Sequence, residues 1–495
     1  MNTFKAPKLV MTFALLSFSL MSSGIKADDG INHYKIKSKS SHDILLLNHG
    51  LASLEERLQM IERSEKTIDV EYFIYRTDKS AKIFTQALVK KARQGVKVRI
   101  LLDYFMVKND LSPFFTHELE KEGIEVKYFN TTATLNLFSG QYRNHRKILA
   151  IDGKEAITGG RNIGDEYFDL HKDYNFLDRE IQIKGDIVKS IDQTFDETFN
   201  AKLSKKVARE KMPEADDAKY NRGDSGNDTS SYNYDLSIWN KKVADAKSFV
   251  NEAMDSSLEN NIRSKGLEEL SSEYRGSCGE LSFHSEYSTV GAKNRKEGRV
   301  LKHYVFEKIK NAEKSIMIDS PYFIVNDELA GALNSAFSKN VDVKLLTNSL
   351  NSTDAIYVYA AFDTIANEWL NKGLDSYIFK GVRPKSYEVI ESQSGEARFG
   401  VHAKTFVFDK KDVIIGTYNV DPRSANYNSE MIISCENNSE LASEVQKDID
   451  LRLAGSIHLD SAKAIKDAEF YQISFGKKLT YYLTKIPAMI FDYLL

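Results

Sequence analysis

The stretch VHAKTFVFDKKDVIIGTYN, Val401–Asn419, places a histidine and a lysine two residues apart at the start of an apolar run. Alternate residues of a strand face the same side, so His402 and Lys404 would project together. Asp409 ends the run, DKKD predicts a turn, and Asn419 follows the returning apolar segment. The stretch therefore predicts a hairpin that carries an imidazole, an ammonium and an amide near one end.

An earlier stretch has the same design. NHRKILAIDGKEAITGGRN, residues 144–162, contains His145 and Lys147 before an apolar run, then Asp152 with a glycine as a hairpin turn, and finally Asn162. A single His-x-Lys on a strand is usually a chance feature of a surface. The same order of residues in both stretches favours a shared chemical role.

The scaffold around the two stretches is repeated as well. IERSEKTIDVEYFIYRTD begins at Ile61 and IKNAEKSIMIDSPYFIVND begins at Ile309. Each is followed by a helical pattern and a further apolar strand, and short apolar strands alternating with helices indicate βαβ units on a sheet that is covered on both faces. The sequence predicts an α/β fold made of a duplicated domain.

Composition limits the function. The chain has 495 residues, of which 42% are hydrophobic and 28% charged, which is typical of a globular protein with sizeable cores. The net charge of −3 does not favour nucleic-acid binding, which usually requires a strongly basic surface. There is no Cys/His cluster with zinc spacing, and we expect neither a metal nor another cofactor.

The N-terminus has the pattern of an export signal. Lys5 and Lys8 precede an apolar run over residues 9–21, and small residues lead to Ala27 and Asp28. This is typical of a cleaved signal peptide, and an uncleaved anchor is the alternative. We expect a periplasmic or secreted protein associated peripherally with membranes.

The two cysteines, Cys278 and Cys435, leave two interpretations open. They form one disulfide in an oxidising compartment, or they are buried free thiols.

Changes in composition suggest the domain limits. Residues 202–235 are polar and charged, whereas the end of the chain mixes aromatic residues, leucines and lysines around Pro487. This end would lie in a membrane interface or pack on a domain as a terminal helix. The expected divisions are a signal peptide over 1–27, a first domain over 28–200, a charged linker or insertion with helices over 201–275, a second domain over 276–455, and an aromatic amphipathic segment over 456–495.

The paired residues suit a phosphate group. Lysine supplies a positive charge, asparagine a neutral donor, and histidine either attacks phosphorus or moves a proton. If the two copies faced each other, His145 and His402 would flank one phosphorus atom, one as nucleophile and the other as general acid. This chemistry requires no metal.

A carboxylate is expected to hold each histidine in the correct tautomer. Glu430 begins a strand pattern after the second stretch, and Asp178 begins a similar one after the first. We therefore assign Glu430 to the second copy and Asp178 to the first. Asp173 remains an alternative, because it follows His145 at the same separation that Glu430 follows His402.

The motifs resemble those of the phospholipase D superfamily, whose signature is His-x-Lys-x4-Asp in two copies. HRKILAID and HAKTFVFD both match this signature. GGRNIGDEYF, SPYFI, LTNSLNSTD and GTYNVDPRSANYNSEM are similar to motifs of bacterial cardiolipin synthases. The resemblance implies two pseudo-symmetric α/β/α sandwich domains with one active site at their interface.

The resemblance also implies residue roles. His145 would form a phosphohistidine, and His402 would act first as acid and then as base. Lys147, Lys404, Asn162 and Asn419 would bind the phosphate, and Asp152 and Asp409 would support the lysines or the turns.

Three functions remain open at this stage. The first is phosphatidyl transfer or hydrolysis on a glycerophospholipid such as phosphatidylethanolamine or phosphatidylglycerol, at a membrane surface and without nucleic acid. The second is an exported endonuclease, for which four arginines near the motifs could recruit phosphates: Arg143, Arg146, Arg161 and Arg423. The third is a non-catalytic membrane-binding scaffold, which two intact motifs make least favoured. The sequence does not indicate the oligomeric state.

Overall fold

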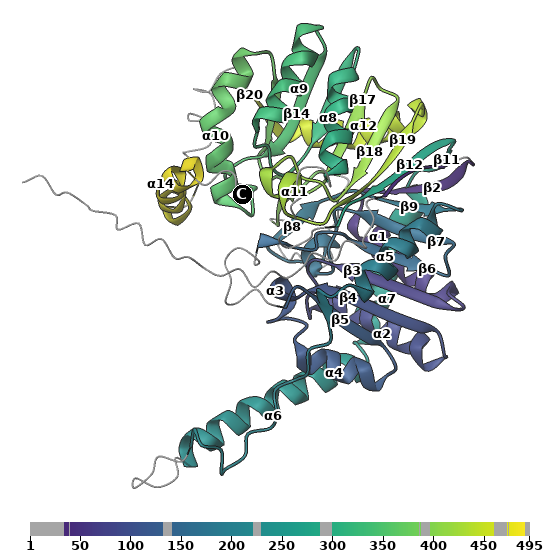
Figure 1. Ribbon diagram of the computed structural model, residues 1–495, viewed down its shortest axis with the longest axis vertical. Helices are drawn as coiled ribbons and strands as arrows, with labels where there is room; N and C mark the ends of the chain where they lie inside the picture. Colours follow the sequence, from purple (N-terminus) through teal and green to yellow (C-terminus); the bar gives the residue numbers. More distant parts are fainter. Residues whose placement is uncertain are drawn as a thin grey trace, which may run out of the picture.

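The protein has two pseudo-symmetric halves, each built on a nine-stranded mixed sheet (Figure 1). The computed structural model describes residues 34–38, 40–131, 141–220, 229–287, 299–385, 387, 397–459, 473 and 475–490. The predicted signal peptide, residues 1–27, lies outside the described residues. The predicted duplicated α/β fold is confirmed.

The first sheet has a parallel core, β3–β4–β5, continued by antiparallel strands on the other side of β3. In sheet order its strands are β10 (Ser204–Lys205), β5 (Glu125–Phe129), β4 (Lys97–Asp103), β3 (Thr67–Tyr72), β6 (Ile148–Ile151), β7 (Glu155–Gly159), β9 (Glu180–Lys184), β2 (His42–Leu47) and β11 (Arg275–Cys278).

The second sheet repeats this order strand for strand. From the edge that corresponds to β10, its strands are β20 (Ser456–Leu459), β15 (Asp375–Phe379), β14 (Asp342–Asn348), β13 (Ser315–Asp319), β17 (Thr405–Phe408), β18 (Asp412–Gly416), β19 (Met431–Glu436), β12 (Glu280–Ser285) and β1 (Tyr34–Lys37). A small parallel pair, β8 (Tyr174–Leu177) and β16 (Arg398–Val401), joins the halves near the centre of the molecule.

Helices cover both faces of the sheets (Figure 1). Those of the first half are α1 (Gly50–Arg63), α2 (Lys79–Arg93), α3 (Tyr104–Val107), α4 (Pro113–Lys121), α5 (Val188–Asn200), α6 (Thr229–Asn251) and α7 (Ser256–Ser272), with a short 3-10 turn, η2 (Asp165–Tyr167). Those of the second half are α8 (Val300–Asn311), α9 (Asp327–Ser338), α10 (Ile356–Asn371), α11 (Pro422–Asn426), α12 (Ser439–Ala454) and α14 (Phe475–Ile490).

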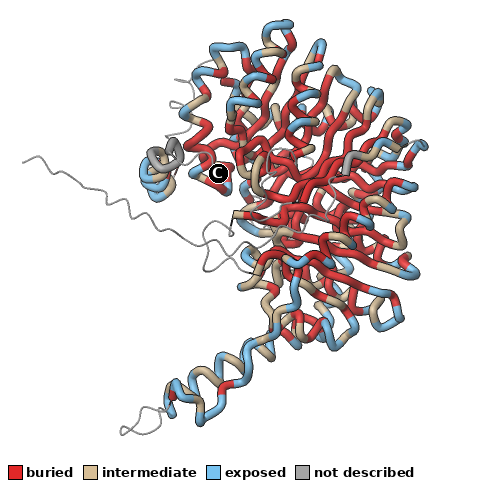
Figure 2. The backbone as a smooth tube through the Cα atoms, in the orientation of Figure 1, coloured by how far each residue is buried: buried red, intermediate tan, exposed pale blue. Residues whose placement is uncertain are grey.

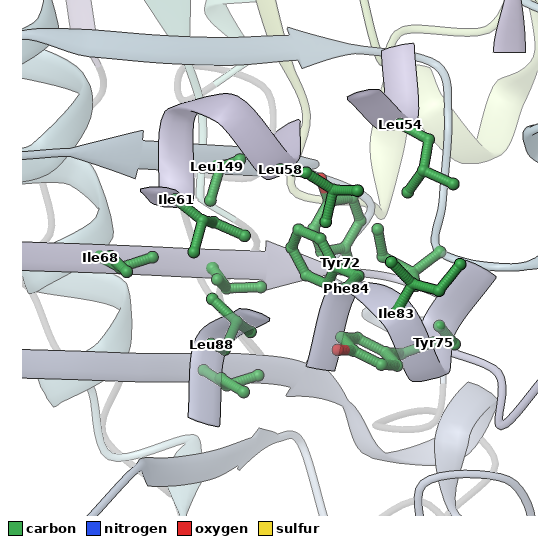
Figure 3. Close-up of a cluster of buried hydrophobic side chains, with 14 of the residues drawn as sticks. Leu54, Leu58, Ile61, Ile68, Tyr72, Tyr75, Ile83, Phe84, Leu88 and Leu149 are labelled. Atoms are coloured by element: carbon green, nitrogen blue, oxygen red, sulfur yellow. The ribbon is translucent and has the colours of Figure 1, made fainter. Parts of the chain in front are cut away.

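Apolar side chains at helical spacing attach the outer helices to the sheets. Leu54, Leu58 and Ile61 of α1 recur three or four residues apart and pack on Ile68 and Tyr72 of β3 (Figure 3). A separate cluster between the two sheets contains residues of β6, β7, β9, β18 and β19 together with α5 and α12. The continuous buried region in Figure 2 thus crosses from one half to the other, so the halves form one body.

The two halves exchange their edge strands. β1, near the start of the described chain, pairs with β12 of the second sheet, and β11 pairs with β2 of the first. Each exchanged strand covers an edge whose backbone groups would otherwise be unpaired. A disulfide between Cys278 of β11 and Cys435 of β19 links the sheets, which decides between the two interpretations of the cysteines.

The elements cross the expected domain limits. β1 lies within 28–200 but completes the second sheet, and β11, most of which lies within 276–455, completes the first. β10 and α7 of the expected linker also pack on the first half. β20, expected in the terminal segment, pairs with β15. The strand placements follow from hydrogen bonding along sheet edges, and that of α7 from packing on α1, neither of which composition reveals. α6, by contrast, extends away from the body (Figure 1).

Candidate active site

Each motif histidine is held by the backbone of the opposite half. The amide of His145 donates to the Ser429 carbonyl at 3.0 Å, and the amide of His402 donates to the Leu177 carbonyl at 2.8 Å. In each half the histidine and its lysine directly precede a strand, β6 in the first half and β17 in the second. The two segments are thereby fixed at the interface between the halves.

Glu430 holds the ring of His145. Its carboxylate lies 2.9 Å from Nδ1 and also accepts hydrogen bonds from Thr417 at 2.5 Å, Ser424 at 2.8 Å and Asn428 at 3.1 Å. Burial raises the pKa of Glu430 to about 7, although Lys147 and these donors oppose the change. Burial and the nearby lysines lower the pKa of His145 well below its ordinary value. The imidazole is therefore neutral near neutral pH.

Asp178 holds the ring of His402, with Oδ2 at 2.5 Å from Nδ1. Burial alone would raise the pKa of Asp178, but His402, Lys404 and Arg161 outweigh it and the pKa falls. Burial and Lys404 lower the pKa of His402 to about 4. This pair differs from the first because its carboxylate keeps its charge.

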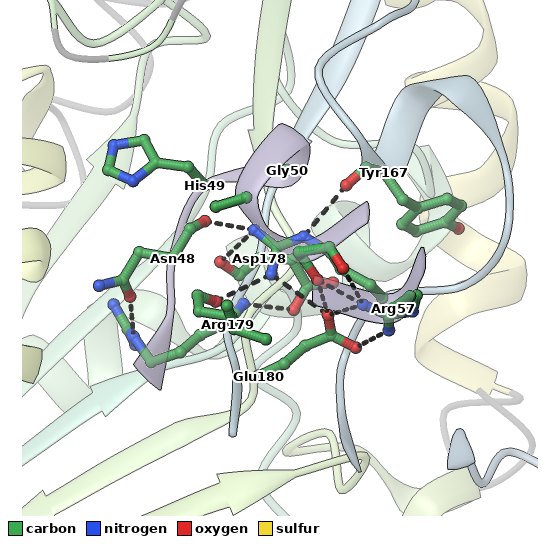
Figure 4. A network of polar contacts seen from close by, with 12 residues as sticks. Asn48, His49, Gly50, Arg57, Tyr167, Asp178, Arg179 and Glu180 are labelled. Carbon is green, nitrogen blue, oxygen red and sulfur yellow. Dashed lines mark hydrogen bonds and ion pairs between the residues drawn. The ribbon is translucent and has the colours of Figure 1, made fainter. Parts of the chain in front are cut away.

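A buried polar network fixes the position of Asp178 (Figure 4). Arg161 donates to the carbonyls of Asp178 and Leu47 at 3.1 and 3.0 Å. The neighbouring Arg179 reaches into the second half, 3.1 Å from Asp319 and 2.5 Å from Asp448. The backbone beside the carboxylate is thus anchored to both halves.

The pairing of histidines and carboxylates crosses between the copies. The sequence assigned Glu430 to His402 and Asp178 to His145, and this assignment is wrong, because the interface brings each carboxylate to the histidine of the other half. Asp173 is exposed, and its carbonyl accepts the Arg398 amide at 3.0 Å. It lies apart from the cavity lining.

Each motif lysine lies against the histidine of its own motif. Lys147 donates to the His145 carbonyl at 2.7 Å, and Lys404 Nζ lies 3.0 Å from Nδ1 of His402. Burial lowers the pKa of Lys147 well below its ordinary value and that of Lys404 to about 8. An anion at the histidines would favour the charged form of both lysines.

The histidines line one cavity of about 660 Å³ between the halves. Because a carboxylate occupies each Nδ1, Nε2 is the ring atom that can reach a substrate. Asn162 and Asn419 lie in the same wall. Asn162 Oδ1 accepts the Ile74 amide at 3.1 Å, and among the residues that the structure describes its Nδ2 donor has no hydrogen-bond partner.

Aromatic and apolar side chains form much of the remaining wall. Phe73 packs edge-on against His145 at 4.9 Å, and Tyr167 packs edge-on against His402 at 5.3 Å between ring centroids. Sequence reasoning missed these residues as site residues. For Phe73 and Tyr322 a signal existed, since both belong to the Tyr-Phe-Ile triplet that is repeated at the end of β3 and just after β13.

Asp152 and Asp409 do not belong with the catalytic residues. Each lies at the far end of its strand and accepts backbone N–H groups from three consecutive residues, 65–67 for Asp152 and 313–315 for Asp409. Of the two supporting roles considered for them, the structure shows the one in the turns. Both have positive φ, 54° and 52°, which aspartate tolerates in a tight hairpin.

The four motif arginines divide into two pairs. Arg146 is buried against Glu71 at 2.9 Å, and Arg161 is occupied by carbonyl groups, so both are structural. Arg143 and Arg423 line the cavity. Among the described residues no group of three or more His, Cys, Asp or Glu side chains has an arrangement that could hold a metal ion.

The arrangement has counterparts in known proteins. A family model described as the PLD-like domain of cardiolipin synthase matches residues 58–199 and 305–452, more than half of the chain. The chain belongs to this family. The two matched segments correspond to the two halves, and each contains one histidine motif.

Individual relatives agree with this membership. A protein of uncharacterized function from Helicobacter pylori is 28% identical over 82% of this chain and 78% of its own length. Cardiolipin synthase C from Escherichia coli is 27% identical over 78% of this chain and 79% of its own. The solved structure of phosphatidylserine synthase from Haemophilus influenzae covers 94% of this chain and 98% of its own, with a TM-score of 0.62 and 12% identity, which supports the fold.

Proposed function

We propose that the protein transfers the phosphatidyl group of a glycerophospholipid to an alcohol or to water through a phosphohistidine on His145. The observation that carries the proposal is the convergence of two imidazoles, one from each half, on one cavity, each with Nδ1 at a carboxylate. Cardiolipin synthases among the relatives make a phospholipid the natural substrate class, with phosphatidylethanolamine and phosphatidylglycerol as donors to test.

In the first step, Nε2 of His145 attacks phosphorus, and the bond from phosphorus to the head-group oxygen breaks. The imidazolium of His402 gives its proton to the departing oxygen. Lys147, Lys404, Asn162 and Asn419 stabilise the charge on the other phosphate oxygens. An anionic phosphate beside His402 raises the pKa of that histidine, which supplies the proton the step requires.

In the second step, a hydroxyl group or water attacks phosphorus, and the P–N bond to His145 breaks. Neutral His402 takes the proton of the attacking group, so both histidines return to their starting state. Water yields phosphatidic acid, and the glycerol hydroxyl of phosphatidylglycerol yields cardiolipin.

The two carboxylates support this division of roles. Asp178 keeps its charge and can stabilise an imidazolium on His402. The pKa of His145 is lowered by burial and the nearby lysines, and His145 faces a carboxyl group whose pKa burial raises to about 7. A neutral imidazole is the better nucleophile.

The test is lipid turnover by the purified chain in vesicles of phosphatidylethanolamine and phosphatidylglycerol, read by mass spectrometry. His145→Ala and His402→Ala should lose at least ~10²-fold in rate. His303→Ala, at an exposed position on α8, should keep the wild-type rate. After rapid quenching, an adduct on His145 that survives in alkali and is lost in acid would identify the intermediate as phosphohistidine.

Other results would redirect the assignment. Unchanged lipids with wild type and variants alike would reject the phospholipid reaction, and a plasmid-nicking assay at low salt would then test the endonuclease. Nicking that both histidine variants lose would establish that function. If the protein has neither activity, and the double histidine variant keeps its cellular role, the protein is a non-catalytic membrane-binding scaffold.

We also propose that α14 docks the protein on an anionic lipid surface. Four side chains along this helix are strongly exposed: Phe475 (81%), Leu479 (49%), Tyr482 (61%) and Leu483 (67%). The helix carries Lys477, Lys478 and Lys485 and no acidic residue, which complements an anionic lipid surface. No helix among the described residues meets the length and hydrophobicity needed to cross a bilayer.

Contacts of α14 connect this surface to the active site. Tyr481 and Lys485 bind Asp363 of α10 at 2.5 and 2.6 Å, and Lys477 donates to the Asn351 carbonyl at 3.0 Å. The first turn of α10 and the preceding loop line the cavity. The helix thus packs on a domain, which is one of the two interpretations of the C-terminal segment. Its exposed apolar side chains support the other, a place in a membrane interface. The helix backbone continues past Pro487 to Ile490.

Vesicle co-sedimentation tests the docking. Leu479→Ser with Leu483→Ser should lower binding to phosphatidylglycerol-containing vesicles several-fold. Leu267→Ser on α7 is the matched control, because Leu267 is also 49% exposed. Equal binding of all three proteins would reject α14 as the docking element.

Export is the last part of the proposal. The Cys278–Cys435 disulfide supports an oxidising compartment, since disulfides persist mainly outside the cytosol. Mass spectrometry of the mature protein should find a start near Asp28 and two cysteines that resist alkylation until reduced. A chain that retains residues 1–27 would indicate the uncleaved anchor instead.

A further inference from the structure

Asn348 binds both backbone groups of Val401, the residue that precedes His402. Its Oδ1 accepts the Val401 amide at 2.8 Å, and its Nδ2 donates to the Val401 carbonyl at 2.7 Å. Asn348 is the last residue of β14 and is buried. Because a side-chain amide carries one donor group and one acceptor, it satisfies both backbone groups as the residue of a neighbouring strand would.

The peptide unit between Val401 and His402 is therefore held from both halves. Its carbonyl accepts Nδ2 of Asn348, and its N–H, which belongs to His402, donates to the Leu177 carbonyl of the first half at 2.8 Å. A peptide unit is planar, so hydrogen bonds at its two ends fix the orientation of the whole plane. That orientation sets the direction in which the side chain of His402 leaves the backbone.

Two serines in the loop between β14 and α10 hold the Asn348 side chain in place. Ser352 Oγ donates to Asn348 Oδ1 at 2.9 Å, and the Ser349 amide donates to Ser352 Oγ at 2.9 Å. Both serines are buried. The amide oxygen of Asn348 thus receives two donors, which leaves its nitrogen to face the Val401 carbonyl.

The first half has a different residue at the equivalent position. Asp103 is the last residue of β4, which corresponds to β14 in the order of the sheets. Its Oδ2 accepts the amide of Asn144, the residue before His145, at 3.0 Å, and its Oδ1 accepts Arg143 at 3.1 Å. An ionised carboxylate only accepts hydrogen bonds, so it cannot hold the carbonyl of Asn144. The two-point contact therefore belongs to the histidine that the proposed mechanism uses as acid and base.

We propose that Asn348 is a positioning residue for His402, which holds the backbone so that the imidazole reaches the departing oxygen as proton donor. This inference rests on the proposed function, in which His402 protonates the leaving group. Asn348 is not part of the described cavity lining, so it acts through Val401 and not on the substrate. A misplacement of about 1 Å can cost roughly 10²-fold in rate. Loss of Asn348 should therefore slow proton transfer and leave the attack by His145 largely intact.

The experiment compares two leaving groups in the first chemical step. Ethanolamine leaves phosphatidylethanolamine as an alcohol and needs a proton, whereas p-nitrophenol leaves phosphatidyl-p-nitrophenol as a stable phenolate and needs none. Rapid quenching of a single turnover measures the release of each. For Asn348→Leu we expect ethanolamine release to fall about 10–100-fold, with p-nitrophenol release within about threefold of wild type because it requires no acid.

Three further variants calibrate the comparison. His402→Ala removes the acid and should slow ethanolamine release far more than p-nitrophenol release, whereas His145→Ala should abolish both. Asn351→Leu is the matched control, because this asparagine lies in the same loop but its Nδ2 donates to the Lys380 carbonyl at 3.0 Å. It should keep both wild-type rates.

A milder variant keeps the test available if Asn348→Leu does not fold. Ser352→Ala removes only the second donor to Asn348 Oδ1 and leaves both bonds to Val401 in place. It should show the same selective loss of ethanolamine release, at a smaller size. Equal losses on both substrates in the variants that fold would make Asn348 part of the fold alone and overturn the proposal, as would wild-type rates on both.

Failure of the proposed function would have a different signature. If wild type releases neither leaving group, or if His402→Ala slows both equally, the reaction or its acid is wrong, whatever the role of Asn348. Hydrogen exchange then tests the positioning by itself. The amides of Val401 and His402 should exchange several-fold faster in Asn348→Leu, or in Ser352→Ala, than in wild type, and equal exchange would overturn the proposal.

Discussion

Glu430, from the second half of the chain, lies 2.9 Å from Nδ1 of His145 in the first half. The reverse relationship holds between Asp178 and His402 at 2.5 Å. Neither half therefore contains a complete histidine–carboxylate pair of its own. Any change in how the halves meet would disturb both imidazoles together.

Glu430→Gln should lose activity in a pH-dependent manner. Because burial raises the pKa of Glu430 to about 7, the wild-type carboxyl group is mostly neutral below that pH and mostly charged above it. Glutamine resembles the neutral form. The ratio of wild-type to variant kcat should therefore be smallest near pH 6 and increase as pH rises through 7. A ratio that stays constant from pH 6 to 8 would contradict this prediction.

Asp178→Asn should be more damaging and less dependent on pH, because the pKa of Asp178 is lowered and its charge persists across this range. Loss of the charge and of the tautomer control should lower kcat by roughly 10²–10⁴-fold. Asp173→Asn is the matched control, since Asp173 is exposed. Comparable losses in both variants would contradict the role given to Asp178.

Asp409→Ala should lower stability more than activity. The substitution leaves three backbone N–H groups without their acceptor and puts alanine at a φ of 52°, which together should cost about 2–4 kcal/mol of unfolding free energy. Asp409→Asn tolerates this backbone conformation and should cost less. Denaturant unfolding and kcat measured below the transition would separate the effects. A folded Asp409→Ala protein without activity would restore a catalytic role.

Removal of the disulfide should destabilise the contact between the halves. Cys278→Ser with Cys435→Ser opens a loop with a sequence separation of 157, for which chain entropy gives about 5 kcal/mol. The melting temperature of the wild type should fall on reduction, and that of the double serine variant should not change with reductant. A wild-type melting temperature that is insensitive to reductant would contradict the prediction.

Much of the site could be predicted from the sequence because both copies carry the same residues in the same order. One cavity is lined by both motif histidines and both motif asparagines: His145, His402, Asn162 and Asn419. Lys147 and Lys404 lie against the histidines. The alternation of apolar strands and helices also predicted the duplicated α/β fold, which the order of the two sheets confirms.

The crossed pairing could not be predicted, because a carboxylate at the head of a strand has the same pattern whichever histidine it serves. The positions of Asp152 and Asp409 in the turns could be predicted, but the sequence left open whether they support the lysines, which their hydrogen bonds to three backbone N–H groups each decide.

The exchange of β1 into the second sheet has a consequence for biogenesis. Its partner β12 is made roughly 250 residues later, and at usual synthesis rates this corresponds to about 10–50 s. Until then the N-terminal strand has no edge to join, and it must remain available while the first half folds behind it. The second sheet is completed by β1, which is synthesised before the rest of the second half. Folding of the two halves is therefore coupled.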